Sequence, residues 1–131
     1  MTIRLSHLLC AILAITCAVN AAPPVSHAQE DSRYLTQKRD LAGLLGQVHF
    51  IRTVCNGEGD QYWRNFMRDF LELEAVNESR RSLFVKAFNH GYRYQSRQLT
   101  QGCSASAVQI EIALAQEGRR LAERIATGYL N

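Results

Sequence analysis

Residues 41–55 read LAGLLGQVHFIRTVC, and their apolar side chains recur every three or four positions. This spacing places them on one face of an α-helix, so the segment predicts a helix with one buried side. The expected buried positions are Leu41, Leu44, Leu45, Val48, Ile51 and Cys55. We expect Asp31 or Ser32 to cap the start of this helix and Asn56-Gly57 to end it.

The same spacing predicts three more helices after Gly57. Asp60, Asn77 and the serines at 104 and 106 precede them and can accept the free amide hydrogens at their starts. The second helix is expected to bury Trp63, Phe66, Met67, Phe70 and Leu73. The third has Phe84, Phe88 and Gly91 or Tyr92 on its apolar stripe, and the fourth has Ile110, Leu114, Gly118, Leu121 and Ile125.

The fold class that follows is all-α. No segment after the N-terminal region alternates as a strand does, and proline is absent after Pro24. The predicted connections are short, which favours antiparallel neighbours. We therefore expect a compact bundle of about four helices.

The first 28 residues have the order of a secretory signal peptide. Arg4 is followed by an almost wholly apolar run from Leu8 to Val19, which is too short to span a bilayer, and then by small residues. Cleavage is expected after Ala28, or alternatively after Ala21, which leaves 29–131 as a single helical domain. No transmembrane segment remains after its removal, and we expect a periplasmic or secreted protein.

Four cysteines are present, and two of them lie in this leader. Cys55 and Cys103 are the pair that remains, and an exported chain folds where thiols oxidise. We predict a disulfide that joins the end of the first helix to the start of the fourth. These cysteines lie 48 positions apart. In the chain-entropy model, a disulfide that closes a loop of this length stabilises the fold by about 4 kcal/mol.

The charge pattern argues against nucleic acid as a partner. The formal net charge is +3, of which the leader contributes one. Most arginines have an acidic residue three or four positions away, which on a helix makes ordinary surface pairs. No block of like charge is long enough to act as a nucleic-acid arm. An anionic component of the cell envelope stays open as a partner, because arginine pairs well with carboxylate and phosphate.

Metal and catalytic motifs are weak. The loop 56–60 resembles a calcium loop in its alternating oxygens, but Gln61 and Met67 stand where that motif needs glycine and glutamate. A zinc site built from both cysteines, His49 and His90 lacks the close ligand spacing of structural zinc sites. A disulfide would silence Cys55 as a nucleophile. The carboxylates at 72 and 74 point to different faces of their helix. We predict no metal or cofactor and favour a non-enzymatic protein.

Polar residues that the core does not obviously require define a candidate binding surface. The disulfide would hold the 56–60 turn rigid, with two further segments packed beside it. The surface consists of Asn56, Glu58, Asp60, Trp63, Arg64, Asn89, Tyr92 and Arg93. The arginines would make charge-assisted contacts. Gly91 is expected to permit close backbone approach, and Asn89 to satisfy backbone groups of the turn.

Several blocks together resemble a family of small secreted alphaproteobacterial proteins of unknown function. They are Cys55-Asn56-Gly57, the segment 62–67, Arg80-Arg81, the segment 87–92, Cys103, Glu117-Gly118 and Leu121. The resemblance runs from about Leu35 to Tyr129. It implies a periplasmic, helical, disulfide-linked domain and supplies no activity.

Two functional hypotheses follow. The first is a non-enzymatic accessory protein of the cell envelope that binds another protein or an anionic envelope component. The alternative is a small-ligand or cation-binding domain, or an unrecognised hydrolase, centred on the 56–60 loop and Asn89. A ridge of small residues on the fourth helix is expected to pack internally, which favours a monomer and leaves a dimer open.

Overall fold

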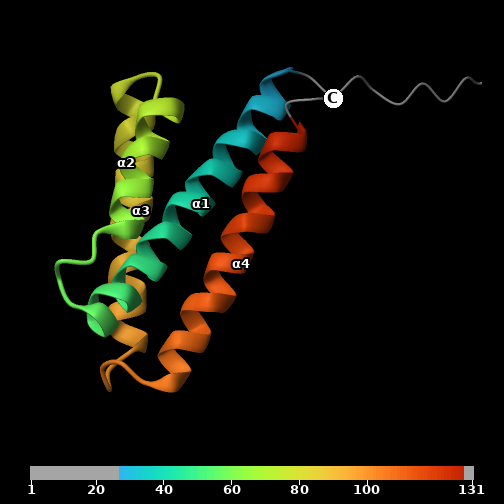
Figure 1. Cartoon of the computed structure of the whole chain (residues 1–131). Helices are drawn as coiled ribbons and strands as arrows, with labels where there is room; N and C mark the ends of the chain where they lie inside the picture. Colours follow the sequence, from blue (N-terminus) through green and yellow to red (C-terminus); the bar gives the residue numbers. More distant parts are fainter. Residues whose placement is uncertain (1–26, 129–131) are drawn as a thin grey trace, which may run out of the picture.

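The computed structural model describes residues 27–128, with side chains from residue 31 onward. Four helices account for most of this range, and no strand occurs within it (Figure 1). They are α1 (His27–Asn56), α2 (Tyr62–Glu74), α3 (Glu78–Gln98) and α4 (Ala105–Gly128). The expected all-α bundle is confirmed.

The long helix α1 is the centre of the molecule. It packs against each of the other three helices, whereas the backbone of α4 comes close to that of α1 alone (Figure 1). Helices α2 and α3 lie together on one side of α1, and α4 lies on the other. The backbones of α2 and α4 stay apart, and α1 lies at the bottom of the space between them.

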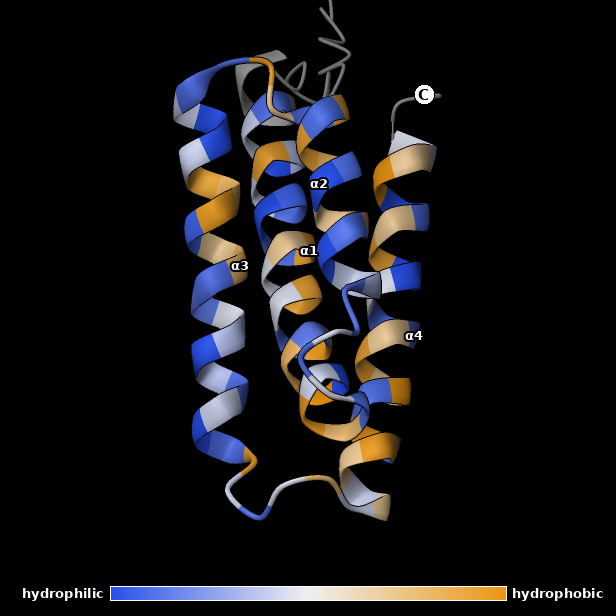
Figure 2. Cartoon of the chain, turned by 60° about the vertical axis from the view of Figure 1, so that its left-hand side comes forward, coloured by the Kyte–Doolittle hydropathy of each residue, from blue (hydrophilic) through white to orange (hydrophobic). Residues whose placement is uncertain are grey.

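The apolar core forms where α1 meets α2 and α3. Phe84 of α3 is fully buried and stacks edge-on against Phe70 of α2, with ring centroids 5.1 Å apart. The predicted stripe of α1 is confirmed at Leu41, Leu45, Val48 and Ile51, which are all buried, whereas Leu44 and Cys55 are half-buried. Hydrophobic positions of α3 are concentrated in its first half, and its second half is mostly hydrophilic (Figure 2).

Most helix ends form as the sequence predicts. Asn77 caps α3, because its Oδ1 accepts a hydrogen bond from the Arg80 amide at 2.9 Å. Ser104 Oγ accepts from the Ala107 amide at the start of α4. Asp60 Oδ1 accepts from the amide of Tyr62 at 3.2 Å, although Gln61 is the residue in the cap position. Gly57 adopts a left-handed φ of 94° after α1 ends, as its position predicts.

The predicted start of α1 is wrong. The helix already includes His27, so Asp31 and Ser32 lie inside it and do not cap it. A residue that can cap a helix need not lie at its start, and the boundary of a helix is the part that a sequence predicts least exactly. The expected leader lies outside the described residues apart from its last two, which belong to α1. Its removal stays a prediction.

The buried face of α2 also differs from the prediction. Met67 and Phe70 are buried as expected, and Leu71 joins them. Phe66 is 50% exposed and Leu73 is 81% exposed, while Trp63 is half-buried. The helix turns a second apolar side toward α4, whose backbone does not come close enough to cover it. On α4, Ile110 is likewise exposed, whereas Leu121 and Ile125 are buried as predicted.

The predicted disulfide between Cys55 and Cys103 is present, with Cα atoms 4.8 Å apart. It joins the end of α1 to the segment that leads into α4. At the other end of α4, the Tyr34 hydroxyl of α1 donates a hydrogen bond to the carbonyl oxygen of Gly128. Helix α4 is therefore fastened to α1 near both of its ends.

Candidate functional site

A pocket of about 460 Å³ opens where α1, α2 and α3 meet the loop that connects α1 to α2. This volume lies within the range of small-ligand sites. Its apolar floor is Met67, Leu71, Val85 and Phe88. Its polar lining is His49, Glu58, Gln61, Arg64, Arg68, Arg81, Asn89 and Tyr92. We call this cavity the arginine pocket.

The three arginines give the pocket its positive charge. Arg64 and Arg68 are four residues apart on α2, so they lie on one face of that helix, and Arg81 comes from the first turn of α3. Within the described part of the chain, neither Arg64 nor Arg81 makes an ion pair or a side-chain hydrogen bond. Arg68 contacts its neighbour Asp69 at 3.1 Å. Glu58 is the only carboxylate in the lining.

His49 contributes an unpaired polar atom. The residue is 5% exposed, and its Nδ1 is buried without a hydrogen-bond partner among the described residues. Its ring lies between Phe88 and Tyr92 of α3, at centroid distances of 5.7 and 5.8 Å. Burial, and then the charge of Arg64, lower the pKa of His49 below its ordinary 6.5, while Glu58 and Asp60 act in the opposite direction. Burial and Arg64 both favour the neutral imidazole over the charged one.

Only half of the predicted binding surface comes together here. Glu58, Arg64, Asn89 and Tyr92 all line the arginine pocket. Asn56 and Asp60 do not, because they bond to each other: Asn56 Nδ2 donates to Asp60 Oδ2 at 2.7 Å. That hydrogen bond, followed by those from Tyr62 and Arg52, lowers the pKa of the Asp60 carboxyl.

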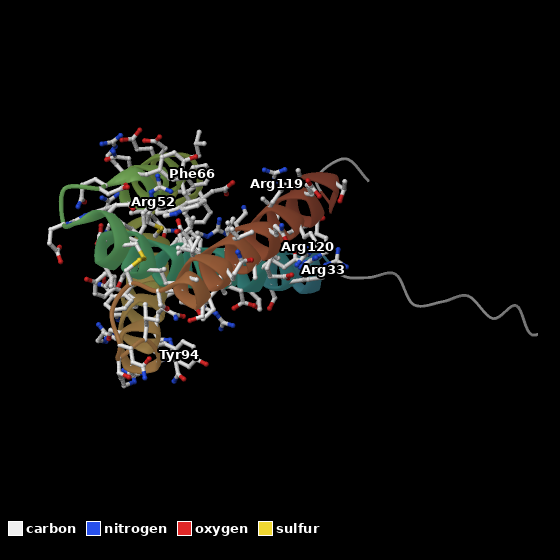
Figure 3. The ribbon with its side chains drawn as sticks, turned by 60° about the horizontal axis from the view of Figure 1, so that its bottom comes forward. Arg33, Arg52, Phe66, Tyr94, Arg119 and Arg120 are labelled. Atoms are coloured by element: carbon white, nitrogen blue, oxygen red, sulfur yellow. A yellow bond between two sulfur atoms is a disulfide. The ribbon has the colours of Figure 1, made fainter. Side chains whose placement is uncertain are left out.

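Asp60 belongs to a structural network on another side of the loop. Arg52 of α1 donates to Asp60 at 2.9 Å and to Glu111 of α4 at 3.3 Å. The indole Nε1 of Trp63 also donates to Glu111, at 3.2 Å. Trp63 therefore faces α4, and Figure 3 shows Arg52 on the same side of the molecule as Phe66. These contacts hold the loop and α2 against α4.

Arg93 is exposed on α3 and does not line the arginine pocket, so its part in a binding surface stays a prediction. The role expected for Asn89 is wrong. Asn89 is exposed and makes no hydrogen bond to the 56–60 turn, so its side chain is available to the pocket. The backbone of that turn is satisfied locally instead, since Gln61 donates to the Glu58 carbonyl at 2.7 Å.

Sequence reasoning missed His49, Gln61, Arg68 and Arg81 as members of this site. The four-residue spacing of Arg64 and Arg68 was a usable signal, because such residues share a helix face. Arg81 carries no comparable signal, because its position depends on how α3 crosses α1.

The pocket has the chemistry of a binding site. Guanidinium groups pair with anionic oxygens, and the amides of Gln61 and Asn89 can donate further hydrogen bonds. The lining contains no serine, threonine, cysteine or lysine that could act as a nucleophile beside His49. Among the described residues, no three histidine, cysteine, aspartate or glutamate side chains are grouped as metal ligands.

Together these features define the class of protein: a small all-α domain, fastened by one disulfide, with a cationic pocket beside its central helix. None of the helices in the described range is long and apolar enough to cross a membrane. The chain belongs to the family described as "Protein of unknown function (DUF2385)", which matches residues 33–129. This confirms the expected membership in a family of unknown function, while an alphaproteobacterial origin stays a prediction. No curated protein and no solved structure gave a match.

Proposed function

We propose that this protein is a non-enzymatic, periplasmic or secreted binding protein that recognises an anionic group of a cell-envelope component in the arginine pocket. The observation that carries the proposal is that three arginines from two helices line one pocket together with His49, whose buried Nδ1 has no hydrogen-bond partner among the described residues. Like charges gathered at one place repel each other, so an anion that neutralises them is favoured there.

The mode of recognition follows from the residue types. Arg64 and Arg81, which have no ion partner in the described part of the chain, would hold anionic oxygens bidentately. Asn89 and Gln61 would donate to the remaining oxygens. Glu58, the single carboxylate, would repel an anion at the rim and accept from a hydroxyl or ammonium group of the same ligand. Phosphodiesters and free carboxylates of the cell envelope carry anionic oxygens of this kind.

Export is supported by two features. The disulfide between Cys55 and Cys103 is typical of proteins that fold in oxidising compartments. The N-terminal residues have the order of a signal peptide. The intact mass of protein recovered from the periplasmic fraction tests this part of the proposal, with a chain starting at residue 29 or 22 as the expected result.

The pocket is tested by calorimetric titration of the purified, oxidised protein. Inorganic pyrophosphate and citrate serve as phosphate and carboxylate probes. The variant combines Arg64→Gln, Arg68→Gln and Arg81→Gln, and we expect its affinity to fall about tenfold for each arginine that contacts the anion. Tighter binding of pyrophosphate would identify the ligand group as a phosphate, and tighter binding of citrate would identify it as a carboxylate.

A matched variant controls for net charge. It combines Arg39→Gln, Arg97→Gln and Arg120→Gln, three exposed arginines outside the pocket. It should bind both probes nearly as well as the parent protein, and both variants should keep the helical circular dichroism spectrum. Equal binding by the pocket variant and the parent would refute the proposal.

A further inference from the structure

A long apolar groove separates α2 from α4 and is floored by α1. Its two sections, of about 550 and 440 Å³, meet at Leu41, Phe66 and Ala122, which line both. We call it the α2–α4 groove. It lies on a different side of α2 from the arginine pocket, and neither section shares a residue with that pocket.

The two walls of this groove differ in shape. The α2 wall carries large apolar side chains that the fold leaves uncovered: Tyr62 is 56% exposed, Phe66 50% and Leu73 81%. The α4 wall combines the larger Ile112, Leu114 and Ile125 with four small residues, Ala115, Gly118, Ala122 and Ala126. Large side chains such as those of α2 can pack over these small residues, as side chains of one helix fit between those of another.

The walls also differ in charge. The α2 wall carries Asp69, whose contact with Arg68 is more than half exposed on both sides. The α4 wall carries Arg119, which makes no ion pair within the described residues. Figure 3 shows Phe66 and Arg119 on the same side of the molecule, with Tyr94 on the opposite side. The α2 wall thus fits the α4 wall in side-chain size and in charge. Because one molecule carries both walls, two copies of the chain can pair through them.

We propose that the α2–α4 groove is the interface of a two-fold symmetric dimer of this chain. A two-fold axis parallel to the helices places α2 of each copy over α4 of the other, so each contact occurs twice. Phe66 of one copy then packs against the alanines of the second copy's α4. Asp69 of one copy comes within reach of Arg119 of the other. The proposal is independent of the arginine pocket.

Sedimentation velocity across micromolar to millimolar concentration tests the dimer. The parent protein should change from monomer to dimer with rising concentration. Phe66→Asp should raise the dissociation constant at least about tenfold, because aromatic anchors dominate such interfaces. Tyr94→Asp is the matched control: it removes an aromatic side chain of similar exposure, 44%, from the face that lacks the groove, and it should leave the dimer intact.

The charge pair gives a second, compensating test. Arg119→Asp alone should weaken the dimer by placing two carboxylates together, and adding Asp69→Arg should restore it. Melting curves establish that each variant is folded. A protein that stays monomeric throughout, or a dimer that Phe66→Asp does not weaken, overturns the proposal. Trp63, the single tryptophan, lines the groove and reports on its occupant. If the protein is monomeric and its tryptophan fluorescence changes when laurate is added, the occupant is an acyl chain and the proposal is overturned.

Discussion

Gly46 and Gly91 set how closely the two principal helices approach. A Cβ atom at Gly46 of α1 would collide with the backbone of Phe88 on α3, and one at Gly91 would collide with the carbonyl of Gly43. The sequence prediction that Gly91 permits close backbone approach is consistent with this contact, although the partner is α1 rather than the 56–60 turn. Phe88 and Tyr92 reach His49 because the helices are this close.

Gly46→Ala should destabilise the protein by about 1–3 kcal/mol, the usual cost of overpacking. Gly43→Ala is the matched control on the same helix. Its Cβ would meet the Ala87 carbonyl at an ordinary 3.7 Å, so the gain in helix propensity should leave stability unchanged or higher. Urea unfolding followed by circular dichroism measures both. Equal stability of the two variants would show that the helices can separate without cost.

Trp63 and Arg64 show why the candidate site was only half predictable from sequence. They are adjacent on α2, and successive residues of a helix point about 100° apart. Arg64 consequently lines the arginine pocket, while Trp63 turns to Glu111 of α4. Deciding which of the two belongs to a site requires knowing where the neighbouring helices lie, and local sequence does not contain that information.

At the scale of elements, local signals predicted most of the fold. Cap residues at 77 and 104, together with helical periodicity, located α3 and α4 because these signals act within a few residues. The buried face of α2 was predicted wrongly at Phe66 and Leu73 because amphipathic spacing does not say whether a partner covers a face. The start of α1 was wrong because helical sequence continues before its expected cap.

Helix α4 should depend on the disulfide more than the other helices do, because its backbone packs closely against α1 alone. Cys103→Ser should lower the free energy of unfolding by about 4 kcal/mol, since the unfolded chain is no longer closed into a loop of 48 residues. Amide hydrogen exchange should accelerate in α4 more than in α3. Thermal and urea unfolding measure the first effect, and exchange mass spectrometry the second.

The parent protein treated with a reductant is the control for this prediction. It should match Cys103→Ser in stability, while the same treatment should leave the variant unchanged. An unfolding midpoint that neither the substitution nor reduction shifts would contradict the role given to the disulfide.

At the scale of the whole molecule, α2 lies between two surfaces of opposite character. The arginine pocket lies between α1, α2 and α3, and the apolar groove lies between α1, α2 and α4. A dimer through the groove would leave both arginine pockets open. The protein would then present two anion sites, and linked sites bind a multivalent envelope surface more tightly than either binds alone.

The proposed function depends on anion binding in the arginine pocket, and His49 lies in the lining of this pocket. In the free protein, burial and Arg64 lower the pKa of its imidazole. The unfolded chain therefore binds a proton more readily than the folded one, so this residue reduces stability as the pH falls below about 6.5. An anion held beside His49 favours the charged ring and should raise its pKa.

Nuclear magnetic resonance can follow the His49 ring through a pH titration, with and without saturating pyrophosphate. Exposed His90 serves as the internal control. We predict that His49 titrates below its ordinary pKa in the free protein. Pyrophosphate should raise the titration midpoint of His49 and should change the midpoint of His90 little. A His49 midpoint that pyrophosphate leaves in place, or that moves no more than that of His90, would contradict anion binding in the arginine pocket.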